Sequence, residues 1–370
     1  MKVELNVNPI ESWAKTNHKP LIIAGPCSAE TPEQLMSTAK LLKDLGKVDV
    51  LRAGIWKPRT RPNAFEGSGE EGLKWLAEVK KELGIQIGTE VANPEHIELA
   101  LKYGVDVLWV GARTTVSPFA IQEMADAMAG VKDKAVLIKN PTHPELGLWI
   151  GAFERFYRAG VRDLAAIHRG FSTIDKSKFR NVPTWSIPIE LKRIAPQIPI
   201  ICDPSHIGGK RDLIFEISQK AMDLGMDGLM IETHIDPDKA WSDADQQVTP
   251  ARLNEILTQL KVRETSSTDQ QFNDHLDELR EKIDNVDREL IEILAQRMAI
   301  VEKIGEYKKQ TNVTTFQVKR WDDIMKNRGD QAKKMNLSEA YVIELFKVIH
   351  EESIRKQTEI MTKAPATTNA

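Results

Sequence analysis

The sequence has 370 residues, of which 41% are hydrophobic and 28% charged, as expected for a globular protein with one large and one small domain. Its 51 Lys and Arg residues nearly balance 54 Asp and Glu residues, and the net charge of −3 argues against nucleic acid or a membrane surface as partner. Two cysteines cannot form a disulfide framework, and no apolar run has the length of a signal peptide or a membrane span, so we expect a cytoplasmic protein.

Short apolar runs alternate with amphipathic segments from residue 20 to about residue 262. Eight of these runs have the length and composition of buried strands. They span residues 21–28, 48–56, 86–91, 106–112, 135–140, 164–170, 199–205 and 228–234.

Helical segments lie between these runs, for example PEQLMSTAKLLKDLG, EEGLKWLAEVKKELG, PEHIELALKYG and RDLIFEISQKAMDLG. Several begin with Pro or an acidic residue and end at Gly, as helix termini commonly do. Eight strand–helix units in about 250 residues predict an α/β protein with a (β/α)8 TIM barrel. A doubly wound open sheet is the competing fold, but a count of eight favours closure.

The alternation stops at the polar stretch KVRETSSTDQ, and the pattern beyond it is purely helical. We therefore predict a barrel domain over residues 1–262, a linker over 263–270 and a small all-α domain over 271–362. The closing residues 363–370, which include APATTNA, predict a disordered tail.

The first helix of the small domain carries a heptad seam, in which residues recur alternately every four and three positions. The seam consists of Phe272, Leu276, Leu279, Ile283, Val286, Leu290, Ile293, Arg297, Ile300 and Ile304. A helix that contains the whole seam measures roughly 50 Å. A small domain cannot bury an apolar stripe of that length by itself, so we predict a homodimer. Arg297 interrupts the apolar seam: it either turns to solvent or fixes the helix register, or it binds an anionic group.

The ends of the predicted strands carry chemically active side chains, and in a TIM barrel these ends surround the active site. They supply Cys27, Arg52 with Lys57, Glu90, Arg113, Lys139, Arg169, Asp203 with His206, and Glu232 with His234. Charge is common wherever one strand meets solvent, but eight such ends together indicate a catalytic site. The cations, joined by Arg59, would repel one another without an anion, so we expect a small substrate bearing phosphate and carboxylate groups.

Four side chains of this region are candidate ligands for one divalent metal ion: Cys27, His206, Glu232 and Asp243. A thiolate, an imidazole and two carboxylates suit manganese, iron, cobalt or zinc better than magnesium. Their spacing is no metal motif by itself, and taken singly Cys27 could be a small core residue and His206 a helix cap. We expect no organic cofactor.

Eight motifs of the barrel resemble those of 3-deoxy-D-arabino-heptulosonate 7-phosphate (DAHP) synthase, in the class whose barrel lacks large insertions. They are GPCSAE (25–30), LRAGIWKPRT (51–60), GARTT (111–115), IKN (138–140), HRG (168–170), DPSH (203–206), IETH (231–234) and SDADQQ (242–247). The resemblance implies metal-dependent condensation of phosphoenolpyruvate with erythrose 4-phosphate to DAHP and phosphate. Related synthases that use arabinose 5-phosphate differ at the KPRT loop, and a different phosphosugar is the alternative.

The same resemblance implies roles for individual residues. The metal ligands are the four candidates above, with Asp243 chosen over Asp245 because it fits the SD-x-x-QQ spacing. Arg59 and Thr60 bind erythrose 4-phosphate together with Lys57. The residues that bind phosphoenolpyruvate are Arg52, Lys57, Arg113, Lys139 and Arg169. The implied catalytic residues are Lys57, which shares a proton with the nascent alkoxide, together with Cys27, His206 and Asp203.

The helical domain resembles the all-helical chorismate mutase, an intertwined dimer that converts chorismate to prephenate. The resemblance rests on LREKIDNVDRELIEILAQRMAIVEKIGEYK (279–308), RWDDI (320–324) and LFKVIHEESIRKQ (345–357). It departs from the family at Gln317 and Trp321, where the family has carboxylates. Gln can accept a hydrogen bond, whereas Trp cannot. The implied chorismate-binding residues are Arg280, Arg297, Lys308, Arg320, Ser353 and Gln357.

Together the two resemblances predict a bifunctional enzyme of the shikimate pathway for aromatic amino acids. The alternative for the helical domain is a dimerising module that binds chorismate or prephenate with little or no turnover. The fusion of the two domains also suggests allosteric feedback inhibition of the barrel by prephenate.

Overall fold

The computed structural model describes residues 3–16, 18–57, 65–174, 176–264 and 266–362. The chain divides into two compact units, Met1–Thr265 and Ser266–Ala370, and the division falls inside the predicted 263–270 linker. The predicted disordered tail, 363–370, lies outside the described residues. None of the helices described is long and apolar enough to cross a membrane.

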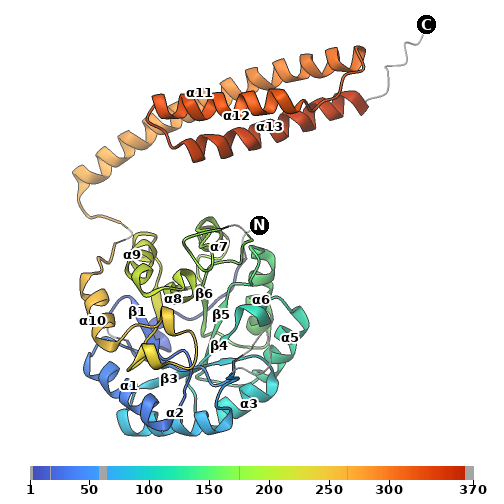
Figure 1. Ribbon diagram of the computed structural model, residues 1–370. Helices are drawn as coiled ribbons and strands as arrows, with labels where there is room; N and C mark the ends of the chain where they lie inside the picture. Colours follow the sequence, from blue (N-terminus) through green and yellow to red (C-terminus); the bar gives the residue numbers. More distant parts are fainter. Residues whose placement is uncertain (1–2, 17, 58–64, 175, 265, 363–370) are drawn as a thin grey trace. The chain divides into compact units, whose positions relative to one another are not determined.

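In the first unit, eight parallel strands follow one another around a closed barrel, and β8 pairs with β1 (Figure 1). This closure confirms the predicted TIM barrel and rules out the open doubly wound sheet. The strands are β1 (Leu21–Gly25), β2 (Val50–Arg52), β3 (Gln86–Val91), β4 (Val107–Val110), β5 (Ala135–Lys139), β6 (Leu164–His168), β7 (Ile200–Cys202) and β8 (Gly228–Glu232).

Helices surround the strands, and two short ones correct the predicted strand ends. Helix α4 (Ala112–Thr115) follows β4 directly and α8 (Pro204–Gly208) follows β7, so Arg113 and His206 lie on helical turns. The others in this unit are α1 (Pro32–Asp44), α2 (Glu70–Leu83), α3 (Pro94–Lys102), α5 (Pro118–Ala127), α6 (Leu146–Arg158), α7 (Ser186–Ile194), α9 (Ile214–Asp223) and α10 (Pro250–Gln259).

A capping residue followed by proline begins five of these helices. The cap side chain accepts a hydrogen bond from a backbone N–H of the first turn, and proline at the next position lacks an N–H that would otherwise be unpaired. The caps are Thr31, Asn93, Ser117, Asp203 and Thr249. The same local rule that starts α8 therefore also fixes Asp203 at the end of β7.

Side chains of each strand alternate between two apolar layers. In β1, Ile22 and Ala24 pack outward against the helices, whereas Ile23 lies inside the barrel with residues such as Trp109. Both faces of the strands are thus buried, which is why the strands are apolar runs rather than alternating ones. The interior is filled and the amino-terminal segment closes it with Ile10, Trp13 and Ala14, so polar chemistry is confined to the opposite end.

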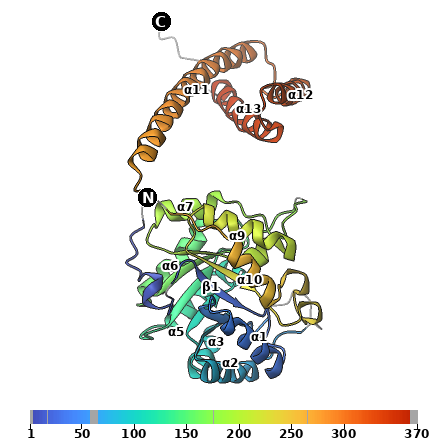
Figure 2. The ribbon, with the colours of Figure 1, turned by 90° about the vertical axis from the view of Figure 1, so that its left-hand side faces the viewer.

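The second unit consists of α11 (Gln270–Gln310), α12 (Val318–Lys334) and α13 (Glu339–Thr362). Helix α11 contains the whole predicted heptad seam in 41 residues, about 60 Å of helix. Figures 1 and 2 show its amino-terminal part extending beyond α12 and α13. Seam residues there are exposed to solvent, among them Ile283 at 60% and Val286 at 62%.

Candidate active sites

Asp203 orients the imidazole of His206 at the carboxyl end of β7. Its Oδ1 atom accepts a hydrogen bond from the backbone N–H of His206 at 3.0 Å, and its Oδ2 atom lies 2.8 Å from Nδ1 of the same ring. Burial opposes ionisation of Asp203, but His206 and then Lys139 outweigh it and lower the pKa of this carboxyl. With Nδ1 fixed in this way, Nε2 of His206 is turned into the site.

Glu232 ends β8 with its carboxylate buried between a cation and this imidazole. Its Oε1 atom lies 3.1 Å from Nη2 of Arg52 and 3.8 Å from Nε2 of His206, and Oε2 accepts a hydrogen bond from Gln246 at 2.6 Å. Burial would raise the pKa of Glu232, but the charges of His206, Arg52 and Lys57 lower it. The carboxylate is therefore ionised in a fully buried position.

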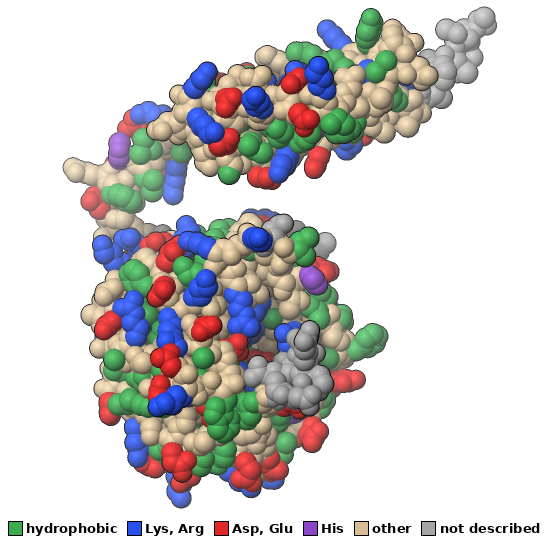
Figure 3. Space-filling model, in the orientation of Figure 1, with side chains coloured by type: hydrophobic (Ala, Val, Ile, Leu, Met, Phe, Trp, Pro, Cys, Tyr) green, Lys and Arg blue, Asp and Glu red, His purple; other side chains and the backbone are tan. Residues whose placement is uncertain are grey.

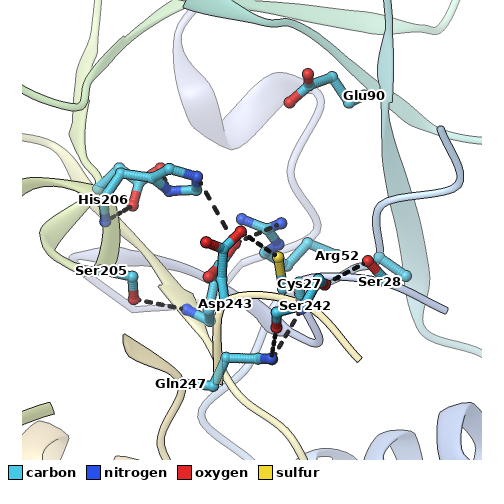
Figure 4. Close-up of polar contacts among 12 residues, drawn as sticks. Cys27, Ser28, Arg52, Glu90, Ser205, His206, Ser242, Asp243 and Gln247 are labelled. Atoms are coloured by element: carbon cyan, nitrogen blue, oxygen red, sulfur yellow. Dashed lines mark hydrogen bonds and ion pairs between the residues drawn. The ribbon is translucent and has the colours of Figure 1, made fainter. Parts of the chain in front are cut away.

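Cys27 follows β1 and contacts two charged side chains. Its Sγ atom lies 3.2 Å from Oδ2 of Asp243 and accepts a hydrogen bond from Nζ of Lys57 at 2.8 Å. Burial, followed by the charge of Glu232, raises the pKa of the Cys27 thiol to about 12. Cys27, Arg52, His206 and Asp243 point toward one another in Figure 4.

Asp243 is held in an uncommon backbone conformation, with φ of +48° in the left-handed region. Arg180 donates from Nη1 to Oδ1 of Asp243 at 2.8 Å and to Oε1 of Gln246 at 2.7 Å. Burial opposes ionisation of Asp243, but the hydrogen bond from Arg180 and the charge of Lys57 lower its pKa. Arg180 therefore connects Asp243 to Glu232 through Gln246.

Two further contacts fasten the loop of Asp243 to the loop of Cys27. The hydroxyls of Ser28 and Ser242 are 2.7 Å apart, and the backbone N–H of Cys27 donates to Oε1 of Gln247 at 2.9 Å. Gln247 in turn donates to the carbonyl of Ser242 at 2.9 Å. These links, visible in Figure 4, bring the SDADQQ motif to the end of β1.

The four predicted metal ligands thus lie in one region as two pairs, Cys27 with Asp243 and His206 with Glu232. Within the described residues, no three His, Cys, Asp or Glu side chains are arranged closely enough to hold an ion. Lys57 lies against the sulfur of Cys27, and Arg180 lies against the Asp243 carboxylate. The metal site and the choice of Asp243 over Asp245 remain predictions.

The predicted anion-binding cations surround these pairs. Lys139, almost fully buried, lies 3.2 Å from Oδ2 of Asp203 and 4.0 Å from Oε2 of Glu90. The pKa of Arg169 is lowered to about 10, mainly by burial. The nearby charges of Arg180 and Arg113 also lower this pKa, whereas the charge of Asp203 opposes the shift. In Figure 3, Lys and Arg side chains border a hollow on the visible face of this unit. The positive charges of these side chains repel one another, and a bound anion would relieve this repulsion.

Several positioning residues are not among the site residues predicted from the sequence. Nη1 of Arg169 donates to Oδ1 of Asn181 at 2.7 Å, and its backbone N–H donates to Oδ1 of Asn140 at 2.7 Å. Asn181 and Arg180 lie in an irregular segment between β6 and α7, which has no periodic signal. Gln246 and Gln247 could have been suspected, because they belong to the quoted SDADQQ motif.

Glu90 at the end of β3 requires a neighbour without a side chain. Its Oε2 atom accepts a hydrogen bond from Nε1 of Trp109 at 2.8 Å. A Cβ atom on Gly111 would lie 2.5 Å from Oε1 of Glu90, so only glycine allows the carboxylate to approach this closely. Arg59 and Thr60, predicted to bind erythrose 4-phosphate, lie outside the described residues.

The predicted chorismate-binding residues are partly assembled in the helical unit. Arg297 on α11 is half-buried and donates from Nη1 to Oγ of Ser353 at 2.6 Å, so it turns toward α13 rather than to solvent. Gln357 donates to the carbonyl of Ser353 at 3.2 Å, and Lys308 donates to the carbonyl of Thr315 at 2.8 Å. Burial and the charge of Arg328 lower the pKa of Arg297.

Two residues of this predicted set do not join the others in one chain. Arg320 on α12 is exposed. Arg280 precedes Arg297 by seventeen residues on the same continuous helix, a separation of about 25 Å along its axis. Arg280 therefore contributes to such a site only from a second chain.

A cavity of about 390 Å³ lies at the other end of the barrel, between the amino-terminal segment and residues near Met222 and Val262. None of the predicted site residues that the structure describes lines it. The candidate site therefore rests on the clustering of charged and hydrogen-bonded groups and not on this cavity.

Comparison with known proteins gives matches for both units. The DAHP synthetase I family matches residues 7–268, and chorismate mutase type II matches residues 279–358. A phospho-2-dehydro-3-deoxyheptonate aldolase of Thermotoga maritima is 34% identical over 240 residues, covering 65% of this chain and 68% of the relative. A 2-dehydro-3-deoxyphosphooctonate aldolase of Cupriavidus taiwanensis is 29% identical over 263 residues, covering 66% and 89%.

Solved structures give the same result for the barrel. The crystal structure of a DAHP synthase from Thermotoga maritima aligns with a TM-score of 0.59 at 33% identity, covering 64% of this chain and 67% of that one. A truncated form of 3-deoxy-D-arabino-heptulosonate 7-phosphate synthase from the same organism aligns with a TM-score of 0.56 at 31% identity, covering 64% and 84%.

Proposed function

This chain belongs to the DAHP synthetase I family and carries a chorismate mutase type II domain, and on that premise we propose that it catalyses both reactions. In the barrel, phosphoenolpyruvate condenses with erythrose 4-phosphate to give DAHP and phosphate, with the help of a divalent metal ion. In the helical unit, chorismate rearranges to prephenate. Both reactions belong to the synthesis of aromatic compounds by the shikimate pathway.

One observation carries the proposal for the barrel: the candidate metal ligands and the candidate anion-binding cations share one end of it. Glu232 and Cys27 are fully buried, and Arg52 and Lys57 contact them directly. The apolar filling of the rest of the barrel leaves this end as the place where a charged substrate can be bound. A metal ion and a phosphorylated acid are the two partners that such a set of groups suits.

By its chemistry, a set of one thiol, one imidazole and two carboxylates suits a divalent metal ion, and we propose that Cys27, His206, Glu232 and Asp243 would hold it. Oε1 of Glu232 is buried and accepts no hydrogen bond from the described residues, although Arg52 and His206 lie near it. Asp203 presents Nε2 of His206 toward the same atom, as the outer partner of a metal-binding histidine does. A metal bound there acts as a Lewis acid on the aldehyde oxygen of the sugar.

The chain's own cations bind and orient the substrates in this proposal. Arg169, Lys139 and Arg113, with Arg52, hold the phosphate and carboxylate of phosphoenolpyruvate. Arg59 and Thr60 hold the phosphate of erythrose 4-phosphate. Lys57 keeps its proton because Cys27 and Glu232 raise the pKa of its ammonium group against the effect of burial, and it shares that proton with the alkoxide formed from the aldehyde.

The sugar is proposed from the KPRT sequence and from the relatives. The phosphoheptonate aldolase of Thermotoga maritima is more similar to this chain than the phosphooctonate aldolase of Cupriavidus taiwanensis. This choice is tested by incubating the protein with phosphoenolpyruvate and either erythrose 4-phosphate or arabinose 5-phosphate and measuring which sugar phosphate gives product. Turnover with arabinose 5-phosphate alone would refute it.

A pair of carboxylate variants tests the metal site. Asp243→Asn is expected to lower both manganese affinity, measured by calorimetry on chelator-treated protein, and the rate of DAHP formation by at least tenfold. Asp245→Asn removes an exposed carboxylate two residues away and is expected to leave both unchanged. Equal losses in the two variants, or full activity of Cys27→Ala, would contradict the assignment.

For the helical unit, we propose a dimer in which α11 of each chain covers the seam of the other. The exposed seam, visible as hydrophobic side chains among charged ones in Figure 3, supports a partner of the same kind. It would also bring Arg280 of a second chain toward Arg297, Lys308, Ser353 and Gln357. The rearrangement needs no nucleophile, so cations that orient the two carboxylates are sufficient for catalysis.

The alternative role is feedback regulation, with prephenate bound in the helical unit and little turnover. Measuring chorismate loss and prephenate binding on the full-length protein separates the two roles. Binding without turnover favours regulation. A barrel rate that is unchanged at saturating prephenate would refute the feedback proposal.

A further inference from the structure

His350 on α13 is held by aromatic rings in the middle of the helical unit. Its ring stacks on Trp321 of α12 with centroids 4.3 Å apart and an angle of 26°, and Phe316 lies edge-on at 6.2 Å. The Nε2 atom of His350 is buried and has no hydrogen-bond partner among the described residues. An unpaired nitrogen in such a place costs free energy unless a ligand completes it.

The same face of α13 carries the predicted chorismate-binding residues. His350, Ser353 and Gln357 follow one another by three and four positions, a spacing that places them on one side of a helix. Gln357 is 7% exposed and its Oε1 atom also has no partner among the described residues. Two unpaired polar atoms therefore lie on the face to which Arg297 is bound through Ser353.

The cations near His350 cannot accept hydrogen bonds. Arg297 and Lys308 carry only donors, and their charges, after burial itself, lower the pKa of His350. A neutral imidazole has one acceptor nitrogen, whereas an imidazolium has none. His350 is thus an acceptor beside groups that recognise carboxylates.

We propose that His350 accepts a hydrogen bond from the hydroxyl group of the dicarboxylate that Arg297 and Lys308 bind, and that Trp321 holds the imidazole ring in place. The proposal rests on the chorismate-binding role proposed above, because chorismate is a dicarboxylate with a secondary hydroxyl. The indole of Trp321 stacks on the His350 ring and so limits the orientations that the imidazole can adopt.

Two substitutions of His350 in the full-length protein test the proposal. His350→Phe keeps an aromatic ring against Trp321 but removes the acceptor, and we expect it to weaken prephenate binding about five- to tenfold, the loss of one hydrogen bond. His350→Gln restores an acceptor and is expected to bind within about threefold of the wild type. Calorimetry with prephenate gives the affinities, and chorismate loss gives KM and kcat.

Controls separate this role from a purely structural one. Lys347→Ala removes an exposed side chain of the same helix and is expected to bind prephenate as the wild type does. If His350→Phe does not fold, His350→Met can be compared with His350→Gln instead. Both side chains are flexible, but only Gln offers a strong hydrogen-bond acceptor. Wild-type binding by the variant that lacks an acceptor would overturn the proposal, as would equal binding by Met and Gln variants.

Arg297→Ala distinguishes this proposal from the one on which it rests. If Arg297→Ala leaves prephenate binding and chorismate loss unchanged, the ligand site itself is wrongly placed. If Arg297→Ala abolishes both while His350→Phe has no effect, the site is right and only the role of His350 is wrong.

Discussion

Asp203 holds His206 through two contacts at once, one to the backbone N–H at 3.0 Å and one to Nδ1 of the ring at 2.8 Å. The first contact caps α8, and the second fixes which ring nitrogen faces the site. A single carboxylate at the end of β7 thereby sets both the position and the orientation of a predicted metal ligand.

Asp203→Asn is therefore expected to weaken manganese binding by about 10–100-fold. The new amide oxygen can still cap α8, but it carries no negative charge and so orients the His206 ring less strongly than the carboxylate does. Calorimetric titration of chelator-treated protein measures this affinity. Asp212→Asn, at an exposed position, serves as the control and should bind manganese normally. An unchanged affinity in Asp203→Asn would show that the contact with Nδ1 is unimportant.

Gly111→Ala is expected to displace the Glu90 carboxylate, whose Oε1 atom would lie 2.5 Å from the new Cβ atom, and so to lower kcat/KM for DAHP formation and to destabilise the barrel by about 1 kcal/mol. Thermal unfolding and steady-state kinetics measure the two effects. Gly151→Ala in α6 meets no atom within 4 Å and should be neutral or stabilising by up to about 1 kcal/mol. Similar behaviour of the two variants would contradict the steric argument.

His168 at the end of β6 is buried against Phe171 and Trp185, and burial followed by the charge of Arg169 lowers its pKa to about 3. The unfolded chain, with a pKa near 6.5, binds this proton at higher pH than the folded chain does. The folded state is consequently favoured above pH 6.5 and loses stability as the pH falls from about 6.5 toward 3, by about 1.4 kcal/mol per pH unit.

Denaturant unfolding between pH 7 and pH 5 measures this slope. His168→Met removes the titrating group and should flatten the dependence by about one proton, whereas His143→Met, at an exposed position, should not. Identical slopes for His168→Met and the wild type would mean that His168 does not carry the effect.

Ile283→Asp with Val286→Asp is expected to convert the protein to monomers, because two charges would be placed in the seam that a second α11 covers. Analytical ultracentrifugation measures the assembly. Chorismate turnover should fall with it, since Arg280 would no longer reach the site of another chain. Glu281→Gln lies outside the seam and should remain dimeric. A wild-type protein that is monomeric at all concentrations would refute the dimer.

The sequence determined the barrel and most of its candidate site, since buried strands are apolar runs and the residues at or just after the end of each strand must lie at the same end of the barrel. Cys27, Lys139, Asp203 and Glu232 could be placed together for that reason alone. The long α11 was equally predictable, because a heptad pattern depends only on local spacing.

Only the tertiary structure decided how these groups are paired. Arg180 reaches Asp243 from an irregular segment, and Gln246 connects Arg180 to Glu232. Neither the hydrophobic periodicity nor the spacing of motifs in the sequence predicts these contacts. The stacking of Trp321 on His350 joins two helices whose relative position depends on packing rather than on either sequence pattern. Local sequence sets helices, strands and their ends, whereas pairing among distant charged side chains depends on the closure of the whole fold.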